Sequence, residues 1–436
     1  MDKVMEWKKE KFNKLISHKS GYTWSKDQEV NKPEPNTIRV LTVSNIQQEL
    51  DLSSELYLHH VSEKDKIEKA VSKGWSIAVS SNGNRKRIGN AIYINQNTDY
   101  LFASFLTAFK PKDGADIDSE FFYRWLTSET IQERISTVSE GTTGLGNLDL
   151  RFLRQMEIYY PESKFEQKAI TTILSKIDEA IETTKQSIRA AEKLKKVMMQ
   201  NLLTGKLKPD GTWRKEEDFY IDEKFGKIPK SWNFKKIKDV FDVNLNSLSS
   251  QTNPDFSFNY ITIENVSTEV IDFENCVNYK FKDSPGRARR NLKNGDILIS
   301  GVRPNLKSFA IYENPNNENW ICSTGFYILS AKENQDKEFY FYQILSSIGE
   351  KQFYSYVAGS NYPAIGDRDL KNMIIYSPGF DEQIEISKKF KILADTISEK
   401  QIKIKSLEKL KKSLMQHLLT GKKRLSNEAI KKINQN

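Results

Sequence analysis

The chain has 436 residues, of which 38% are hydrophobic and 29% charged, and its formal net charge is +9. This length predicts two or three domains, and the positive charge suits a polyanionic partner such as nucleic acid. The only two cysteines, Cys276 and Cys322, exclude a disulfide framework and a CxxC metal motif.

The chain shows no targeting or membrane segment. Its first fifteen residues, MDKVMEWKKEKFNKL, are charged and contain no apolar core of signal-peptide length. No apolar run elsewhere is long enough to span a bilayer. We therefore expect a soluble, cytoplasmic protein with no membrane association.

Residues 1–162 have the composition of a compact α+β domain. Short runs rich in β-branched and aromatic residues, separated by Asn, Gly, Pro and Asp, predict strands at 37–43, 75–81, 90–95 and 101–109. A helix is predicted from Ser119 to Ser128. Two loops carry polar or basic residues, Arg85, Lys86 and Arg87 in one and Thr142 and Thr143 in the other.

Residues 163–206 predict a long helix. A coiled-coil seam follows from the apolar residues at alternating three- and four-residue steps, Leu174, Ile177, Ile181 and Ile188. Ser163 and Glu166 predict a capping box at its start, and Gly205 predicts a left-handed end. A polar linker at 207–225 follows.

Residues 226–379 form a second β-rich region, with strands predicted at 259–263, 296–300, 309–313 and 326–331 and a helix from Lys337 to Ile348. Its loops carry Arg287, Arg289, Arg290, Arg303 and Lys307, then Ser360, Asn361 and Tyr362. A second long helix is predicted at 380–422, with the seam residues Phe390, Leu393, Ile397 and Ile404. Residues 423–436 are a basic tail.

The two long helices are copies of each other. Residues 166–206 align without a gap with residues 382–422 at an offset of 216, and 17 of 41 positions are identical. The resemblance extends upstream more loosely, and Trp7 has a counterpart in Trp232. The chain is therefore a duplicated pair of a β-rich region and a helix.

An amphipathic helix of about 38 residues exposes its apolar stripe unless another helix covers it. The nearest partner for each helix is its own copy. We therefore expect an α+β fold in which two tandem domains are separated by two long antiparallel helices forming a coiled coil with internal pseudo-twofold symmetry. Homodimerisation through each helix separately is the alternative.

The sequence carries no motif for catalysis. It has no GxxxxGK[ST] loop, no GxGxxG after a strand and no NPPY- or DPPY-like tetrapeptide. The four histidines lack metal-ligand spacing. We expect no catalytic residue, no metal site and no cofactor.

The repeated pattern resembles a known family. A β-rich region ending in a proline, then Glu-Gln, then a long helix closing in LLTGK, all present twice, is similar to the specificity subunit of a type I restriction-modification system. The segment Ile228 to Trp232, IPKSW, resembles the opening of that family's recognition domains. The resemblance implies target-recognition domains at 1–162 and 226–379, each reading one half-site of a bipartite double-stranded DNA target.

The resemblance also implies partners. These are two modification subunits, which methylate adenine with S-adenosylmethionine, and restriction subunits, which are ATP-dependent translocases and nucleases. Both catalytic activities would belong to the partners. The basic and polar loop residues named above are then candidate DNA contacts.

Both helix ends carry apolar residues beside lysines, Met198, Met199, Leu202, Leu203, Leu414, Met415, Leu418 and Leu419. We interpret them as a docking surface used once for each modification subunit, with DNA binding by the lysines as the alternative. Two other functions stay open. A standalone nuclease or methyltransferase with divergent motifs would act on DNA unaided, whereas a structural or RNA-binding coiled-coil protein would show no preference among duplex sequences.

Overall fold

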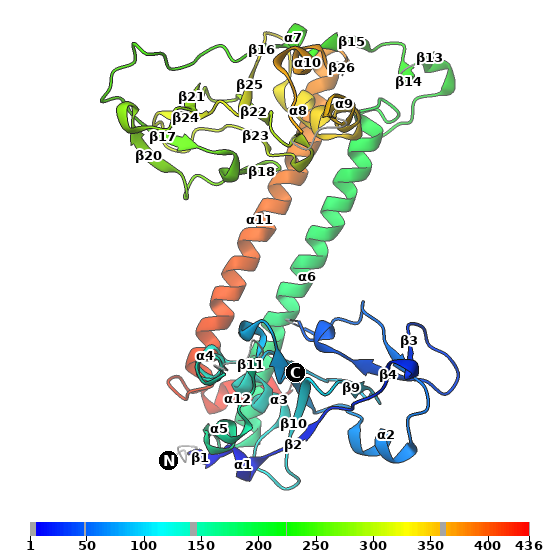
Figure 1. Ribbon diagram of the computed structural model, residues 1–436, viewed down its shortest axis with the longest axis vertical. Helices are drawn as coiled ribbons and strands as arrows, with labels where there is room; N and C mark the ends of the chain where they lie inside the picture. Colours follow the sequence, from blue (N-terminus) through cyan, green and yellow to red (C-terminus); the bar gives the residue numbers. More distant parts are fainter. Residues whose placement is uncertain (1–5, 48, 140–145, 224, 358–362, 436) are drawn as a thin grey trace. The chain divides into compact units, whose positions relative to one another are not determined.

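The computed structural model describes residues 6–47, 49–139, 146–223, 225–357 and 363–435 (Figure 1). The chain divides into two compact units: unit 1 contains residues 1–185 and 402–436, and unit 2 contains residues 186–401. Each boundary falls inside one of two long helices, α6 (Lys164–Leu202) and α11 (Phe380–Leu418). Each unit therefore combines one β-rich region with the first part of one long helix and the last part of the other.

Unit 1 is built on two four-stranded sheets. The first has the antiparallel order β2 (Ile16–Ser20), β10 (Leu106–Pro111), β6 (Ser76–Val79), β8 (Ala91–Tyr93). The second has the order β3 (Glu29–Val30), β5 (Tyr57–Leu58), β4 (Ile38–Leu41), β9 (Leu101–Phe102), with β4 and β9 parallel. Two strand pairs join β1 (Trp7–Lys11) to β12 (Glu157–Pro161) and β7 (Ser81–Asn82) to β11 (Gly146–Asn147). The short helices are α1 (Phe12–Leu15), α2 (Glu63–Lys69), α3 (Ser119–Leu126), α4 (Glu129–Val138), α5 (Leu150–Gln155) and the 3₁₀ turns η1 (Lys26–Gln28), η2 (Val43–Asn45) and η3 (Arg85–Arg87).

Unit 2 repeats this arrangement. Its first sheet has the order β16 (Phe241–Val243), β25 (Phe326–Ala331), β22 (Ile297–Ser300), β23 (Phe309–Ile311). Its second has the order β20 (Val277–Lys280), β17 (Ser257–Ile261), β24 (Trp320–Ser323), β21 (Ala288–Asn291), and β17 and β24 are parallel. The paired strands are β15 (Asn233–Lys236) with β26 (Ile374–Ser377), β13 (Phe219–Asp222) with β14 (Gly226–Pro229), and β18 (Val266–Ser267) with β19 (Val270–Ile271). The helices are α7 (Ile237–Val240), α8 (Lys337–Leu345), α9 (Ser347–Val357), α10 (Asp367–Asn372) and the 3₁₀ turns η4 (Glu216–Asp218), η5 (Ile263–Asn265), η6 (Phe281–Asp283) and η7 (Pro304–Leu306).

The predicted strands and helices are found, with two differences. A turn breaks the run at 101–109 into β9 and β10, and Ser346 divides the helix predicted from Lys337 to Ile348 between α8 and α9. The first sheets of the two units share one antiparallel order, and the second sheets share three strands, β5-β4-β9 and β20-β17-β24, with the last two parallel in each. The fourth strand lies at opposite edges, β3 beside β5 in unit 1 and β21 beside β24 in unit 2. The shared part confirms the α+β fold and the internal repeat.

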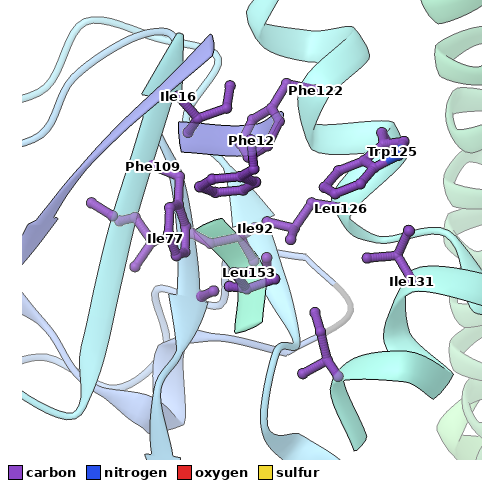
Figure 2. Packing of buried hydrophobic residues seen from close by; sticks show 14 of the residues in the cluster. Phe12, Ile16, Ile77, Ile92, Phe109, Phe122, Trp125, Leu126, Ile131 and Leu153 are labelled. Atoms are coloured by element: carbon purple, nitrogen blue, oxygen red, sulfur yellow. The ribbon is translucent and has the colours of Figure 1, made fainter. Parts of the chain in front are cut away.

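Aromatic rings pack among aliphatic side chains in the core of unit 1 (Figure 2). Phe12 lies edge-on to Phe109 and to Phe122, with ring centroids 5.7 Å apart in both pairs. Phe12, Phe109 and Phe122 are almost completely buried, and burial of a large apolar side chain contributes roughly 1.5–3 kcal/mol. Leu418 and Leu419, from the end of α11, belong to the same core. The last turn of α11 is therefore part of the folded unit 1.

A buried glutamine holds the start of each long helix to its β-rich region. In unit 1, Gln167 Nε2 donates to the Pro161 carbonyl oxygen (2.8 Å), and the Asp118 backbone N–H donates to Gln167 Oε1 (2.6 Å). In unit 2, Gln383 Nε2 donates to the Pro378 carbonyl oxygen, and the Asp336 backbone N–H donates to Gln383 Oε1, both at 2.9 Å. The repeated Glu-Gln pair of the sequence therefore contains a structural glutamine in each copy.

The repeated glutamates bind arginines, which corrects the expected capping box. Both carboxylate oxygens of the fully buried Glu166 accept hydrogen bonds from Arg424, at 2.8 and 2.7 Å, so the carboxylate is used there. In unit 2, Glu382 accepts bonds from Arg214 (2.5 Å) and from Trp232 Nε1 (3.1 Å). Each arginine comes from the segment that follows a long helix.

The long helices are antiparallel. In unit 1, early α6 lies beside late α11, and Lys411 Nζ is 2.6 Å from an oxygen of Asp178. In unit 2, Leu202 near the end of α6 and Phe390 near the start of α11 share one core. The left-handed helix ends are also confirmed, with φ of 68° at Gly205 and 70° at Gly421.

The predicted seam residues differ in burial. Ile177, Ile181 and Ile188 are buried, but Leu174 and Phe390 belong to the cores of the two units. Leu393, Ile397 and Ile404 are only partly buried.

The polar linker and the basic tail both contain regular structure. The linker at 207–225 contains η4 and β13, and the tail at 423–436 contains α12 (Asn427–Gln435). Ile430 of α12 is buried, and Asn434 Nδ2 donates to the Phe165 carbonyl oxygen at the start of α6 (3.0 Å). The tail is therefore part of unit 1.

Candidate nucleic-acid interface

In unit 1 the candidate basic turn η3 is held against the segment that follows α4. Strand β7, which precedes η3, pairs with β11 through Gly146↔Asn82 and Asn147↔Ser81. An added Cβ on Gly146 would lie 3.2 Å from Arg85 Cγ, so the two segments are in contact. We define the η3 hub of unit 1 as residues 80–87 and 146–148.

Unit 2 has an equivalent hub around η7. The Arg303 backbone N–H donates to the Pro363 carbonyl oxygen (2.6 Å), and Ile365 N–H donates to the Gly301 carbonyl oxygen (2.9 Å). The segment 363–365 follows α9, as the segment 146–148 follows α4. We define the η7 hub as residues 301–307 and 363–365.

Tyr327 packs against the η7 hub and forms a hydrogen bond with it. Its hydroxyl donates to the Ile365 carbonyl oxygen (3.0 Å), and burial raises the pKa of this hydroxyl, so it stays a protonated donor. An added Cβ on Gly301 would lie 2.7 Å from the Tyr327 ring, a separation that real Cβ atoms essentially never show. Gly301 is therefore required by close packing.

Among the candidate cations, Arg85, Lys86, Arg287 and Arg303 are exposed. Within the described part of the chain, the side chains of Lys86 and Arg287 form no hydrogen bond or ion pair with another residue. Arg303 has a left-handed backbone (φ 48°), which is uncommon for a residue with a side chain and is typical of strained functional turns.

Arg87 and Lys307 are less exposed than these four and bind the protein backbone. Arg87 Nη2 donates to the carbonyl oxygens of Val43 (2.9 Å) and Ile46 (2.5 Å), so its guanidinium holds η2. Lys307 donates to the Leu345 carbonyl oxygen (3.2 Å) and lies 3.6 Å from Glu350. These two residues position the hubs.

Arg289 and Arg290 lie on strand β21 with partners of their own. The Arg289 guanidinium lies 4.8 Å from the Phe281 ring centroid, and Arg290 Nη1 donates to Ser247 Oγ (3.1 Å). The β24–β25 turn links this strand to the η7 hub, because Thr324 N–H donates to the Arg287 carbonyl oxygen and Gly301 N–H to that of Gly325, both at 2.8 Å. The five remaining candidates lie outside the described residues: Thr142, Thr143, Ser360, Asn361 and Tyr362.

Both β-rich regions, each with part of a long helix, match a known protein family. A family model described as "Type I restriction modification DNA specificity domain" matches residues 5–193 and again residues 229–409, which is most of the chain. The chain belongs to this specificity family. The two matches coincide with the two copies of the internal repeat.

The specificity subunit has relatives of the same kind. It is 27% identical over 335 residues to the type I restriction enzyme MjaVIII specificity subunit of Methanocaldococcus jannaschii, with 75% of each chain covered. It is also 27% identical over 329 residues to the MjaIX specificity subunit of the same organism, with 72% of this chain and 71% of that one covered.

Solved structures share its fold. One is the crystal structure of a type I restriction-modification system S subunit from M. genitalium. The alignment covers 96% of this chain and 97% of the M. genitalium chain, with a TM-score of 0.58 and 16% sequence identity. Another is a chain from a structural study of complex assembly and conformational transition in a type I restriction-modification system. Its alignment covers 95% of this chain and 98% of that chain, with a TM-score of 0.51 and 13% sequence identity.

The expected docking surface of the specificity subunit needs a correction. Its four leucines are almost completely buried, Leu202 and Leu203 in the core of unit 2 and Leu418 and Leu419 in the core of unit 1. Leucines in a core are not available to another subunit. The remaining candidates are partly buried against the same cores, Met198, Met199, Leu414 and Met415.

Sequence reasoning missed the pairing of the hub segments and the two arginines on the repeated glutamates. The β7–β11 pair joins residues more than 60 positions apart. Gly146 and Gly301 were the available signals, because glycine allows close approach of neighbouring segments.

Within the described residues, no helix is long and apolar enough to cross a membrane, and no cluster of His, Cys, Asp and Glu could hold a metal ion.

Proposed function

We propose that this specificity subunit reads a bipartite duplex DNA target, with unit 1 contacting one half-site and unit 2 the other. The observation that supports the proposal most strongly is the repeated hub. In each unit a central strand leads into a turn with an exposed arginine. Backbone hydrogen bonds join the residues between the strand and the turn in unit 1, and the turn residues themselves in unit 2, to the segment after a helix. A rigid turn presents its side chains in a defined direction, which sequence reading requires.

The side chains suit DNA. Arginine binds phosphate oxygens or forms paired hydrogen bonds with the O6 and N7 atoms of guanine. Arg85 and Lys86 supply these groups in unit 1, and Arg287 and Arg303 supply them in unit 2. Arg87 and Lys307 act indirectly, because their donors hold neighbouring backbone.

We further propose that the catalytic steps belong to other subunits. The partners would be modification subunits that methylate adenine and restriction subunits that move along and cut DNA. The partly buried methionines beside the helix ends, Met198, Met199 and Met415, are candidates for docking a modification subunit. Methionine adapts well to irregular partner surfaces.

Selection from a random duplex library tests the reading function. The full-length chain, purified with its modification subunits, should enrich two short sequences separated by an unspecified spacer. Arg85→Ala should relax one half-site and Arg303→Ala the other, because loss of a paired arginine contact costs about 1–3 kcal/mol of discrimination. Lys14→Gln, which removes an exposed lysine paired with Glu10, is the control. One continuous motif, or no enrichment, would contradict the proposal.

The absence of catalysis is tested separately. Rigorously purified chain, supplied with S-adenosylmethionine or with a divalent cation, should neither methylate nor cut DNA, since the sequence has no cofactor loop. Methylation should appear only when the modification subunits are added. Turnover by the chain alone would refute this part of the proposal.

A further inference from the structure

A large apolar side chain is exposed beside the η3 hub. Phe105 lies in the turn between β9 and β10 and is 55% exposed. Its turn is closed by a hydrogen bond from Leu106 N–H to the Ala103 carbonyl oxygen (2.9 Å). Single exposed apolar residues are common on protein surfaces, so exposure alone carries no conclusion.

The backbone around Phe105 is fixed to the hub. Its carbonyl oxygen accepts hydrogen bonds from both Ser80 N–H (2.8 Å) and Ser81 N–H (3.1 Å). Ser81 pairs with Asn147, and Leu148 N–H donates to the Ser80 carbonyl oxygen (2.8 Å). The exposed ring is therefore carried on a rigid turn that is bonded directly to the segment leading into η3.

The equivalent turn in unit 2 carries a different residue. There, Gly301 N–H donates to the Gly325 carbonyl oxygen (2.8 Å), so Gly325 occupies the place of Phe105. A residue needed for the fold of this turn would not be phenylalanine in one copy and glycine in the other. Unit 2 instead exposes Leu306, 62% exposed, on η7 itself. Each hub thus presents one large apolar side chain, from a different segment.

The chemistry of a phenyl ring restricts what it can contact on DNA. A neutral ring offers no hydrogen bond to a phosphate, whereas it makes favourable contact with the 5-methyl group of thymine in the major groove. Such a contact carries sequence information, because that methyl group distinguishes thymine from the other bases. A different apolar residue in each unit is what two readers of different half-sites require.

We propose that Phe105 is a base-contacting residue of unit 1 that recognises a thymine through its 5-methyl group. This inference rests on the proposed function and adds to it a contact that no charged residue can make. Phe105 contributes discrimination at one base pair, and Arg85 and Lys86 contact phosphate oxygens or guanine beside it.

The test uses the full-length chain with its modification subunits and the target sequence obtained by selection. Phe105→Ala should weaken binding to that target about tenfold and should flatten the preference at one A·T pair of one half-site. Replacing the thymine of that pair by deoxyuridine removes only the methyl group. This replacement should weaken binding by the original protein severalfold and leave binding by Phe105→Ala unchanged.

Two controls separate this effect from a loss of structure. Ile67→Ala removes another exposed apolar side chain of unit 1, 81% exposed on α2, and should leave affinity and preference unchanged. Phe105→Leu keeps an apolar side chain on the same turn and should restore part of the affinity, with thermal unfolding unaltered in all three variants.

Two outcomes would overturn the inference while the proposed function stands. One is that Phe105→Ala binds the selected target like the original protein. The other is that affinity falls by the same factor for every base pair and deoxyuridine has no effect at any position, which would indicate a wedge or a non-specific contact. Absence of any sequence preference in the original protein would instead contradict the proposed function.

Discussion

At the scale of single residues, the repeated glutamines are the clearest case of a sequence motif with a structural cause. Gln383 is 2% exposed, and its side-chain amide satisfies two backbone groups. Leucine at this position would leave the Asp336 N–H and the Pro378 carbonyl oxygen buried without a partner. A buried unsatisfied polar group costs about 1–3 kcal/mol.

We therefore expect Gln383→Leu to lower the free energy of unfolding by about 2–4 kcal/mol. Urea unfolding followed by tryptophan fluorescence measures this, since Trp232 is buried in unit 2. Gln401→Leu changes an exposed glutamine of the same helix and should have little effect. Equal effects of both substitutions would show that the hydrogen bonds of Gln383 do not stabilise the fold.

Gly301 leads to a prediction about DNA reading. A methyl group at this position would push the Tyr327 ring away and weaken its bond to the Ile365 carbonyl oxygen. Gly301→Ala should therefore loosen the η7 hub and reduce discrimination at one half-site by about tenfold, with the other half-site unaffected. Binding to targets altered in one half-site at a time provides the measurement. Gly379→Ala, where an added methyl group meets no atom within 4 Å, is the control.

At the scale of elements, the C-terminal tail binds the start of α6 in unit 1. Arg424 forms two hydrogen bonds with Glu166, which is completely buried, and its guanidinium carbon lies 5.9 Å from the Trp7 ring centroid. In unit 2 the linker supplies Arg214, which contacts Glu382 and lies 5.5 Å from the Trp232 ring centroid. Linker and tail therefore perform the same structural task.

Arg424→Ala should destabilise unit 1 by about 3 kcal/mol, because it leaves a buried carboxylate without its partner. The double variant Arg424→Ala with Glu166→Gln should recover part of this loss, since the buried charge is then also removed. Thermal unfolding of the single and double variants measures the difference. A double variant less stable than Arg424→Ala alone would contradict this account.

Truncation after Ser426 separates the contribution of α12 from that of Arg424. It keeps the Arg424–Glu166 contact and removes the buried Ile430 and the bond of Asn434. We expect a smaller loss of stability than in Arg424→Ala.

At the scale of the whole molecule, each β-rich region has its own sheets and core. We therefore expect that each region can be replaced independently by the equivalent region of a relative. The clusters around Phe12 and around Trp232 contain no residue in common. Replacing residues 226–379 by the equivalent region of a relative should change one half-site and leave the other intact. Sequencing the methylated sites of cells that carry the chimaera provides the measurement, and a change in both half-sites would contradict independent reading.

The sequence by itself determined the repeat, the β-rich and helical segments, and the helix ends at Gly205 and Gly421. These features depend on local periodicity and on backbone preferences, which nearby residues decide. The basic turns at Arg85 and Arg303 were also evident, because they follow strongly apolar strands.

Only the tertiary structure decided which of those residues are available. Leu202 and Leu418 have the same apolar pattern whether they face a partner or a core, and folding placed both in cores. Arg87 and Lys86 are neighbours of equal charge, yet only Arg87 is bound to the carbonyl oxygens of η2. Phe105 gave no sequence signal, because an apolar residue in a strand-rich run is usually buried. Burial and long-range contacts depend on where distant segments meet, and local sequence does not encode that.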